Sequence, residues 1–271
     1  MQDLFNLSGK VAIVTGTSRG LGQYFARALA KAGADLVITS RELSRLNEFK
    51  QEIESLGRKA LAVQLDVLSQ SDIDNMVQMT IKEYGKIDIL VNNAGLNIRK
   101  PSIEVTQQDW DTILDTNLKG SFFCAQAVAK EMIKRNPGTT RSAKNPLRGG
   151  RIINIGSCTC VFGMEGIAAY TASRGAILSM TRSLAAEWGK FGITVNVLAP
   201  GWFKTAQNAV LYENKEWLNY ITDRIPLNRP GQPNDLDGTV IFLASDACGY
   251  ITGQIILVDG GFTTGATRAI T

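Results

Sequence analysis

Short apolar runs alternate with longer stretches of mixed polarity along most of this chain of 271 residues. Apolar runs without polar positions are typical of strands in a parallel sheet, which helices cover on both faces. We predict strands at residues 11–14, 34–39, 60–65, 87–91, 152–155, 193–198 and 255–258. Helices are predicted at residues 20–32, 42–56, 69–84, from 106 onward, from 170 towards 189, and 233–245.

This alternation of strands and helices predicts an α/β fold with a doubly wound parallel sheet. The chain is long enough to bury one large core, and no linker rich in Pro, Gly or Ser divides it. We therefore expect a single domain over residues 1–271.

The first predicted strand ends in a glycine-rich turn. Thr15 and Gly16 follow the apolar run, and two further glycines stand at positions 20 and 22, where a helix is predicted to begin. Glycine lets a ligand or a helix approach the backbone closely, and a helix N-terminus with bare amides binds anions. The turn therefore predicts a phosphate or pyrophosphate site, and its place at the first strand–helix junction favours a dinucleotide over a plain tight turn.

Several motifs resemble those of the short-chain dehydrogenase/reductase family. The turn reads T-G-x-x-x-G-x-G, N-N-A-G occupies residues 92–95, and P-G-x-x-x-T occupies residues 200–205. Ser157 and Tyr170 stand in the order and spacing of the family's catalytic serine and tyrosine. The resemblance runs from residue 7 to 262. It implies a Rossmann-type fold, an NAD(P)-dependent alcohol dehydrogenase or ketone reductase, and a homotetramer.

The composition limits the kinds of partner that we expect this protein to bind. The net charge is only +4, from 29 basic and 25 acidic side chains, and aromatic residues do not interleave with basic ones, so nucleic acid is not expected. The first residues lack a leader-like pattern, and no run of about 18 apolar residues occurs. We expect a cytoplasmic protein that acts on a small molecule and does not associate with membranes.

The chain contains no histidine. This excludes Ser-His-Asp hydrolases, histidine-dependent 2-hydroxy-acid dehydrogenases and histidine-ligated zinc sites. Cysteines 124, 158, 160 and 248 have neither a disulfide spacing nor a metal-site spacing, so we expect reduced, mostly buried thiols and no metal. Proton transfer must come from Tyr, Lys, Cys or a carboxylate.

The second predicted strand ends at Ser40 and Arg41, where a doubly wound fold meets the adenosine ribose. An acidic residue here would favour a free 2′-hydroxyl, but this chain has no carboxylate there, and Arg19 projects from the glycine turn. Because a guanidinium can grip a phosphate with two hydrogen bonds, we predict NADP(H), with NAD(H) left open. The alternative is that Arg41 only begins the charged face of the next helix.

The resemblance implies further cofactor contacts. Asp66 matches the family's adenine-binding acid, although an aspartate at a strand end is also a common turn or helix cap. Asn92 is interpreted as structural. The predicted cofactor residues are Gly16, Ser18, Arg19, Gly20, Leu21, Gly22, Ser40, Arg41, Asp66, Val67, Asn93, Ala94, Gly95, Tyr170, Arg174, Pro200, Gly201, Phe203 and Thr205.

The resemblance also implies a catalytic group of Asn117, Ser157, Tyr170 and a cation one helical turn after the tyrosine. In the family the tyrosine hydroxyl exchanges a proton with the substrate oxygen, the serine hydrogen-bonds that oxygen, and the asparagine holds a water in the proton path. Free tyrosine has a pKa of about 10, so a nearby positive charge must stabilise the phenolate.

This chain departs from the family at the cation, because position 174 is Arg where the family has Lys. Arginine keeps the positive charge of lysine but cannot give up a proton. Its planar guanidinium group also has a different shape from the compact ammonium group of lysine. Two interpretations stay open: a working enzyme with an altered proton relay, or a dinucleotide-binding regulatory protein with weak chemistry.

The substrate is less determined. Arg99 follows N-N-A-G at the distance of a basic residue in gluconate 5-dehydrogenases, which suggests a sugar acid or polyol such as gluconate or 5-ketogluconate. A solvent-exposed loop arginine is the alternative. Reduction of a 3-oxoacyl thioester is the competing reaction. Residues 206–229 are predicted to form either a lid over the substrate or a small aromatic core. The basic stretch 134–151 is predicted to form either a solvated loop or a rim that attracts anions.

Overall fold

The computed structural model describes residues 4–137, 149–205 and 208–265. The central part of the predicted basic loop, residues 138–148, lies outside them, as do residues 206–207 of the predicted lid. Within these described ranges, no helix is long and apolar enough to cross a membrane.

The described residues form one parallel sheet of seven strands in the order β3-β2-β1-β4-β5-β6-β7. The strands are β1 (Val11–Val14), β2 (Asp35–Ser40), β3 (Ala60–Gln64), β4 (Ile89–Asn92), β5 (Gly150–Ile155), β6 (Ile193–Pro200) and β7 (Ile255–Val258). The order reverses direction between β1 and β4. In such sheets the ligand crevice lies beyond the carboxyl ends of the strands at this reversal.

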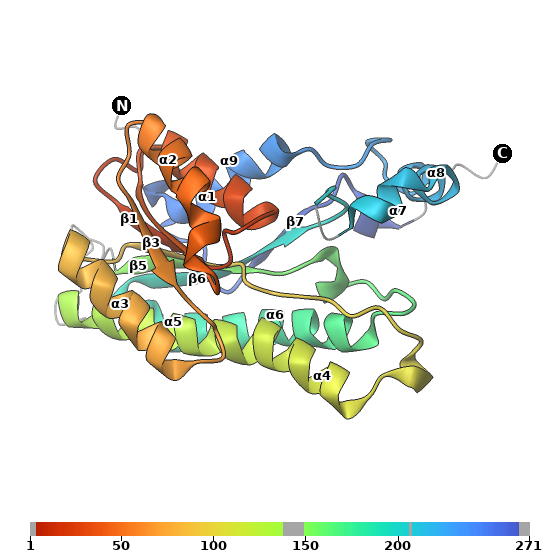
Figure 1. Cartoon of the computed structure of the whole chain (residues 1–271), viewed down its shortest axis with the longest axis horizontal. Coiled ribbons are helices and arrows are strands. Elements are labelled where there is room, and N and C mark those ends of the chain that lie inside the picture. The colour runs from red at the N-terminus through yellow and green to blue at the C-terminus, as the bar shows by residue number, and fades with distance from the viewer. Residues whose placement is uncertain (1–3, 138–148, 206–207, 266–271) are drawn as a thin grey trace.

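Helices cover both faces of the sheet (Figure 1). The α-helices are α1 (Leu21–Lys31), α2 (Asn47–Ser55), α3 (Gln70–Tyr84), α4 (Gln107–Leu114), α5 (Gly120–Arg135), α6 (Ala168–Trp188), α7 (Ala209–Glu213), α8 (Lys215–Asp223) and α9 (Asp237–Ala244). In Figure 1, α1, α2 and α9 lie on one face of the sheet, and α3, α5 and α6 lie on the other. The predicted doubly wound α/β fold is confirmed.

The core consists of two apolar layers separated by the sheet. In β1, Ala12 and Val14 join the layer beneath α1 and α9, whereas Val11 and Ile13 join the layer beneath α3, α5 and α6. Successive side chains of a strand point to opposite faces, so an uninterrupted apolar run fills both layers. This explains why the strands appear in the sequence as solid apolar runs.

Several predicted helix ends are confirmed. The side chain of Ser69 caps α3, Gly85 ends it in the left-handed conformation, and Thr106 and Asp109 form a capping box at α4. The predicted helix 42–56 differs in its first part, because residues 43–46 form a 3₁₀ turn before α2 begins. The long helix predicted from residue 106 is interrupted by a π-helical segment, Asp115–Lys119, between α4 and α5.

Charged side chains connect the elements at the amino end of the sheet. The buried carboxylate of Asp88 accepts a hydrogen bond from the amide of Val11 at 2.9 Å, and it forms ion pairs with Arg135 at 2.9 Å and Lys86 at 3.3 Å. These contacts tie the start of β1 to β4 and to the end of α5.

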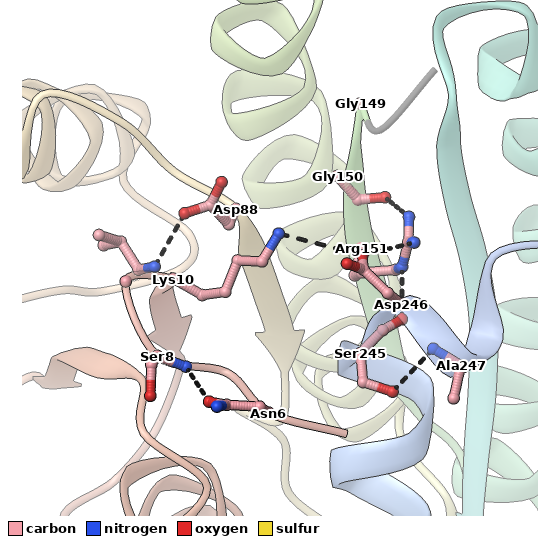
Figure 2. Close-up of polar contacts among 12 residues, drawn as sticks. Asn6, Ser8, Lys10, Asp88, Gly149, Gly150, Arg151, Ser245, Asp246 and Ala247 are labelled. Atoms are coloured by element: carbon pink, nitrogen blue, oxygen red, sulfur yellow. Dashed lines mark hydrogen bonds and ion pairs between the residues drawn. The ribbon is translucent and has the colours of Figure 1, made fainter. Parts of the chain in front are cut away.

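A second charged group at this end centres on Arg151 at the start of β5 (Figure 2). Its guanidinium, only 7% exposed, donates to the carbonyl oxygen of Ser245 at 3.0 Å and forms an ion pair with Asp246 at 3.6 Å. Lys10 lies 4.0 Å from the same carboxylate. The acidic and basic side chains described here therefore pair with one another at this end of the sheet.

Candidate active site

A cavity of about 610 Å³ opens at the carboxyl ends of the strands. Its wall contains every predicted cofactor residue except Gly22, together with the predicted catalytic residues Ser157, Tyr170 and Arg174. Asn117 and Arg99 are not part of this wall. The structure thus brings segments between residues 16 and 208 around one space.

The glycine turn is shaped by close packing. A Cβ atom on Gly16 would lie 3.0 Å from the Cα atom of Ala94, and one on Gly22 would lie 2.6 Å from the Nδ2 atom of Asn93. Asn93 donates from that amide nitrogen to the carbonyl oxygens of Thr15 and Gly16, at 2.9 and 3.1 Å. Gly22 therefore lies behind the cavity wall, and any larger residue at this position would push the glycine turn out of place.

The amino end of α1 faces the cavity through Gly20 and Leu21. Gly20 has a φ of 66°, and neither a capping side chain nor an acidic residue in the first turn competes for the helix amides. Thr205 lies across from this turn, since a Cβ atom on Gly20 would be 3.8 Å from the Cβ atom of Thr205. The arrangement suits an anion held between the helix and the segment after β6.

Sequence reasoning missed Asn208, which holds that segment in place. Its Oδ1 atom accepts hydrogen bonds from the amide of Thr205 at 2.7 Å and from its hydroxyl at 3.2 Å, while its Nδ2 atom donates to the carbonyl of Phe203 at 2.8 Å. Asn208 also lines the cavity. The short spacing from Thr205 was the only sequence signal.

Three arginines line the part of the cavity where the adenosine ribose is predicted to lie. Arg19 and Arg41 are both exposed, and none of the ion pairs among the described residues uses them. Arg45, which the sequence analysis did not single out, lines the same region but is paired with Glu42 at 2.7 Å. Two guanidinium groups are thus left for a ligand.

Asp66 caps a turn and lines the cavity, while its contact with adenine stays a prediction. Its Oδ1 atom accepts a hydrogen bond from the amide of Leu68 at 3.0 Å, so it caps the turn after β3. It also lines the cavity beside Val67.

Tyr170 and Arg174 lie on one face of α6, as their spacing predicts. The guanidinium carbon of Arg174 is 4.9 Å from the centre of the Tyr170 ring, within the range of a cation–π contact. Ser157 begins the turn after β5, where its Oγ atom accepts a hydrogen bond from the amide of Thr159 at 3.2 Å. Hydroxyl groups and a cation therefore share one wall of the cavity.

Arg174 is only 6% exposed. Its Nη1 atom donates to the carbonyl oxygen of Ile155 at 2.7 Å, and a Cβ atom on Gly95 would lie 2.7 Å from its Nη2 atom. Among the described residues nothing accepts a hydrogen bond from its Nε atom. The arginine thus fastens the end of β5 to α6 and packs against the loop after β4.

Asn117 is fully buried in the π-helical segment. Its Oδ1 atom accepts from the amide of Leu96 at 2.8 Å, and its Nδ2 atom donates to the carbonyl of Leu96 and to the hydroxyl of Ser173, both at 3.0 Å. Ser173 in turn donates to the carbonyl of Tyr170 at 2.7 Å. The side chain of Asn117 therefore joins the loop after β4 to the catalytic helix, and its water-holding role stays a prediction.

Arg99 lies outside the cavity wall. It is exposed, and its guanidinium donates to the carbonyl of Glu165 at 3.4 Å while its aliphatic part lies against Gly166. Its predicted contact with the substrate stays a prediction.

The aromatic residues of the predicted lid form a cluster with their surroundings. The ring centres of Trp202 and Trp217 are 5.3 Å apart, and Tyr212 and Phe262 pack on the same pair at 5.3 and 5.9 Å. Burial raises the pKa of Tyr212 to about 12, so it stays neutral. A satellite core, which the sequence analysis left as one of two interpretations, is present; closure over a substrate stays a prediction.

All four cysteines are free thiols, and Cys124, Cys158 and Cys248 are buried. Burial raises the pKa of Cys158 to about 11, which makes it a poor proton donor or nucleophile despite its place next to Ser157. Within the part of the chain that the structure describes, no cluster of metal-ligating side chains occurs. The hydroxyl groups remain the candidates for chemistry.

A family model described as enoyl-(acyl carrier protein) reductase matches residues 16–263, most of the chain. The chain belongs to the short-chain dehydrogenase/reductase family. The predicted family is thereby confirmed, and the dehydrogenases described next confirm the predicted enzyme class, an NAD(P)-dependent alcohol dehydrogenase or ketone reductase.

Individual relatives match nearly end to end. Gluconate 5-dehydrogenase of Gluconobacter oxydans is 39% identical over 261 residues, which cover 96% of this chain and 97% of that protein. 2-Dehydro-3-deoxy-D-gluconate 5-dehydrogenase of Escherichia coli is 40% identical over 258 residues, with coverage of 95% and 97%. The crystal structure of a gluconate 5-dehydrogenase from Burkholderia cenocepacia in complex with NADP and tartrate has 37% identity and a TM-score of 0.90, covering 97% of this chain and 99% of that chain.

Proposed function

We propose that this short-chain dehydrogenase/reductase transfers a hydride between NADP(H) and a secondary alcohol or ketone of a sugar acid, such as gluconate or 5-ketogluconate. The observation that carries the proposal is one cavity that holds the glycine turn at one part of its wall and Ser157 and Tyr170 at another. Relatives named for gluconate and for its dehydro-deoxy derivative, similar along nearly their whole length, support the substrate class.

The residues present fit NADP(H). The bare amino end of α1 faces the cavity, and the glycines at positions 16 and 22 let the turn before it pack closely against Ala94 and Asn93. Arg19 and Arg41 offer two guanidinium groups at the ribose end, where a 2′-phosphate requires positive charge. The Burkholderia enzyme crystallised with NADP supports the same choice.

Three side chains of the protein have different roles in the proton transfer. NADP(H), when bound, supplies or takes up the hydride. In reduction, the Tyr170 hydroxyl donates its proton to the substrate oxygen while the Ser157 hydroxyl donates a hydrogen bond to the same atom; in oxidation Tyr170 accepts the proton. Arg174 places a guanidinium beside the Tyr170 ring, and this group stabilises the phenolate without passing on a proton.

The test is NADPH oxidation by the purified protein with simple ketones, 5-ketogluconate and 3-oxoacyl thioesters, beside the same panel for Arg174→Lys. We expect the wild type to prefer 5-ketogluconate. A preference for thioesters would favour the competing reductase. If NADPH binds by fluorescence but only the lysine variant turns over, the native protein is a cofactor-binding member whose chemistry is switched off at position 174.

Two further properties are proposed from the family resemblance. We infer a homotetramer that works in the cytoplasm, paired through the helices around 106–135 and 170–190 and through the C-terminal strand. Multi-angle light scattering should give four times the chain mass of 29.4 kDa. A monomer mass would contradict the assembly without affecting the proposed reaction.

A further inference from the structure

Asn97 stands on the cavity wall, and none of the roles described above uses it. It lies in the loop after β4, two residues beyond Gly95, and lines the same cavity as Ser157 and Tyr170. Its Oδ1 atom is buried and receives no hydrogen bond from any of the described residues.

The loop that carries Asn97 is fixed on both sides. Before it, Asn117 binds both the amide and the carbonyl of Leu96, at 2.8 and 3.0 Å. After it, the amide of Lys100 donates to the carbonyl of Gly166 at 3.0 Å, and the Lys100 ammonium pairs with Asp109 at 2.6 Å. A side chain presented by such a loop can bind a ligand with little further loss of conformational entropy.

The unpaired Oδ1 atom of Asn97 lowers the stability of the unliganded protein. A buried polar atom without a partner destabilises a protein by about 1–3 kcal/mol, and native structures rarely keep one without a functional reason or a bound water. The Oδ1 atom of Asn97 is closed off from solvent as it stands, but an amide side chain carries both an acceptor and two donors, and a half-turn about its last torsion exchanges their places. It is therefore suited to a group that can both donate and accept, and a hydroxyl is such a group.

We propose that Asn97 binds a hydroxyl group of the substrate other than the one that reacts at Ser157 and Tyr170. The inference rests on the proposed function, which places a polyhydroxylated substrate in this cavity. A plain ketone has no hydroxyl to offer the amide. Sites built to hydrogen-bond a substrate hydroxyl discriminate strongly against analogues that lack it, so Asn97 sets the preference for polyhydroxylated ketones over plain ones.

The test compares Asn97→Leu with the wild type on 5-ketogluconate and on a plain ketone that the wild type reduces, at saturating NADPH. We expect kcat/KM for 5-ketogluconate to fall about 10- to 100-fold, the scale of a lost hydrogen bond with an unpaired partner. The value for the plain ketone should stay within about twofold. The Kd of NADPH, measured by fluorescence, should not change.

Calorimetry supplies a readout that does not require turnover. Gluconate should bind the wild-type protein with NADPH present, a pair that cannot react because both partners are in the reduced form, and binding should weaken by about the same factor in Asn97→Leu. Asn75→Leu is the matched control, because Asn75 is exposed on α3 and lies off the cavity wall. The thermal midpoint of Asn97→Leu should equal or exceed that of the wild type, since the substitution removes an unpaired acceptor.

Equal losses on both ketones, or an unchanged kcat/KM on 5-ketogluconate together with unchanged gluconate binding, would overturn the role of Asn97. A wild type that reduces only plain ketones or thioesters contradicts the proposed function instead, and gluconate binding by the two proteins then still decides the role of Asn97. If the wild type does not bind gluconate either, both proposals are wrong.

Discussion

The two ends of the central sheet use polar side chains in opposite ways. At the amino end, Asp88 and Asp246 each face cations, and Arg151 is held by the Ser245 carbonyl and by Asp246 (Figure 2). At the carboxyl end, Arg19 and Arg41 have no ion pair among the described residues.

The difference separates groups that hold the fold from groups kept for a ligand. Burying charge is tolerated only when the charge is paired, so the amino end contributes to folding without offering a site. Leaving buried polar atoms such as Asn97 Oδ1 unpaired lowers stability, and a ligand can recover that loss. Substitutions at the two ends should therefore change different observables.

Tyr170→Phe should give the largest effect. It removes only the hydroxyl group that exchanges the proton, so kcat should fall by about 10²- to 10⁴-fold. The thermal midpoint should stay at its wild-type value, and the Kd of NADPH should rise by no more than about tenfold, the scale of one lost hydrogen bond to the cofactor. Tyr250→Phe, at a fully exposed position, is the matched control. Retained activity in Tyr170→Phe would remove the tyrosine from the mechanism.

Arg151→Met should act on stability alone. It leaves Asp246 and the Ser245 carbonyl without their buried partner, and the free energy of unfolding should fall by about 2–4 kcal/mol. Urea denaturation measures the loss, and kcat per folded molecule should not change. A variant of unchanged stability would show that the amino-end contacts hold little of the fold.

Arg41→Asp should change cofactor choice. Removing one charge-assisted contact and adding a repulsive carboxylate should weaken NADPH binding by about 10- to 100-fold, with NADH binding spared. Fluorescence titration with both cofactors measures the change. Lys82→Asp, at an exposed position of α3 away from the cavity and from the helices proposed to pair, controls for the change in net charge. Equal losses for both cofactors would contradict the assignment of Arg41 to the 2′-phosphate.

Arg99→Gln tests the predicted substrate contact of an arginine that lies off the cavity wall. If its charge attracts the carboxylate of a sugar acid, KM for 5-ketogluconate should rise by up to about fivefold, the scale of an exposed charge contact. KM for uncharged ketones should not change. An identical KM on both would leave Arg99 as a residue that only fastens its loop to Glu165.

Asp109→Asn should give the smallest effect, and it should depend on pH. The hydrogen bond from Lys100, then those from Thr106, lower the pKa of Asp109 to about 2, below an unfolded value of about 3.9. The carboxylate therefore adds stability above about pH 4, and this is lost as the pH falls through the folded pKa of about 2. The small difference in thermal midpoint between the two proteins should narrow between pH 4 and pH 2. A difference that is constant with pH would contradict this origin.

Much of the fold was predictable because its signals are local. The solid apolar runs of the strands, the caps at Ser69 and Thr106, and the terminating Gly85 each depend on neighbours within a few residues. The motif residues of the cofactor site follow the strands directly, and parallel strands bring their carboxyl ends to one edge. The doubly wound fold and the location of the site therefore follow from the sequence pattern and the resemblance together.

The rest was decided by contacts between distant segments. The sequence marked position 174 as an unusual arginine, but only the packed structure places its guanidinium against Tyr170, Gly95 and the Ile155 carbonyl. In the same way, only the fold leaves Asn97 without a donor. A residue type determines which hydrogen bonds a side chain is able to make, whereas the segments that fold around it determine which of them are satisfied.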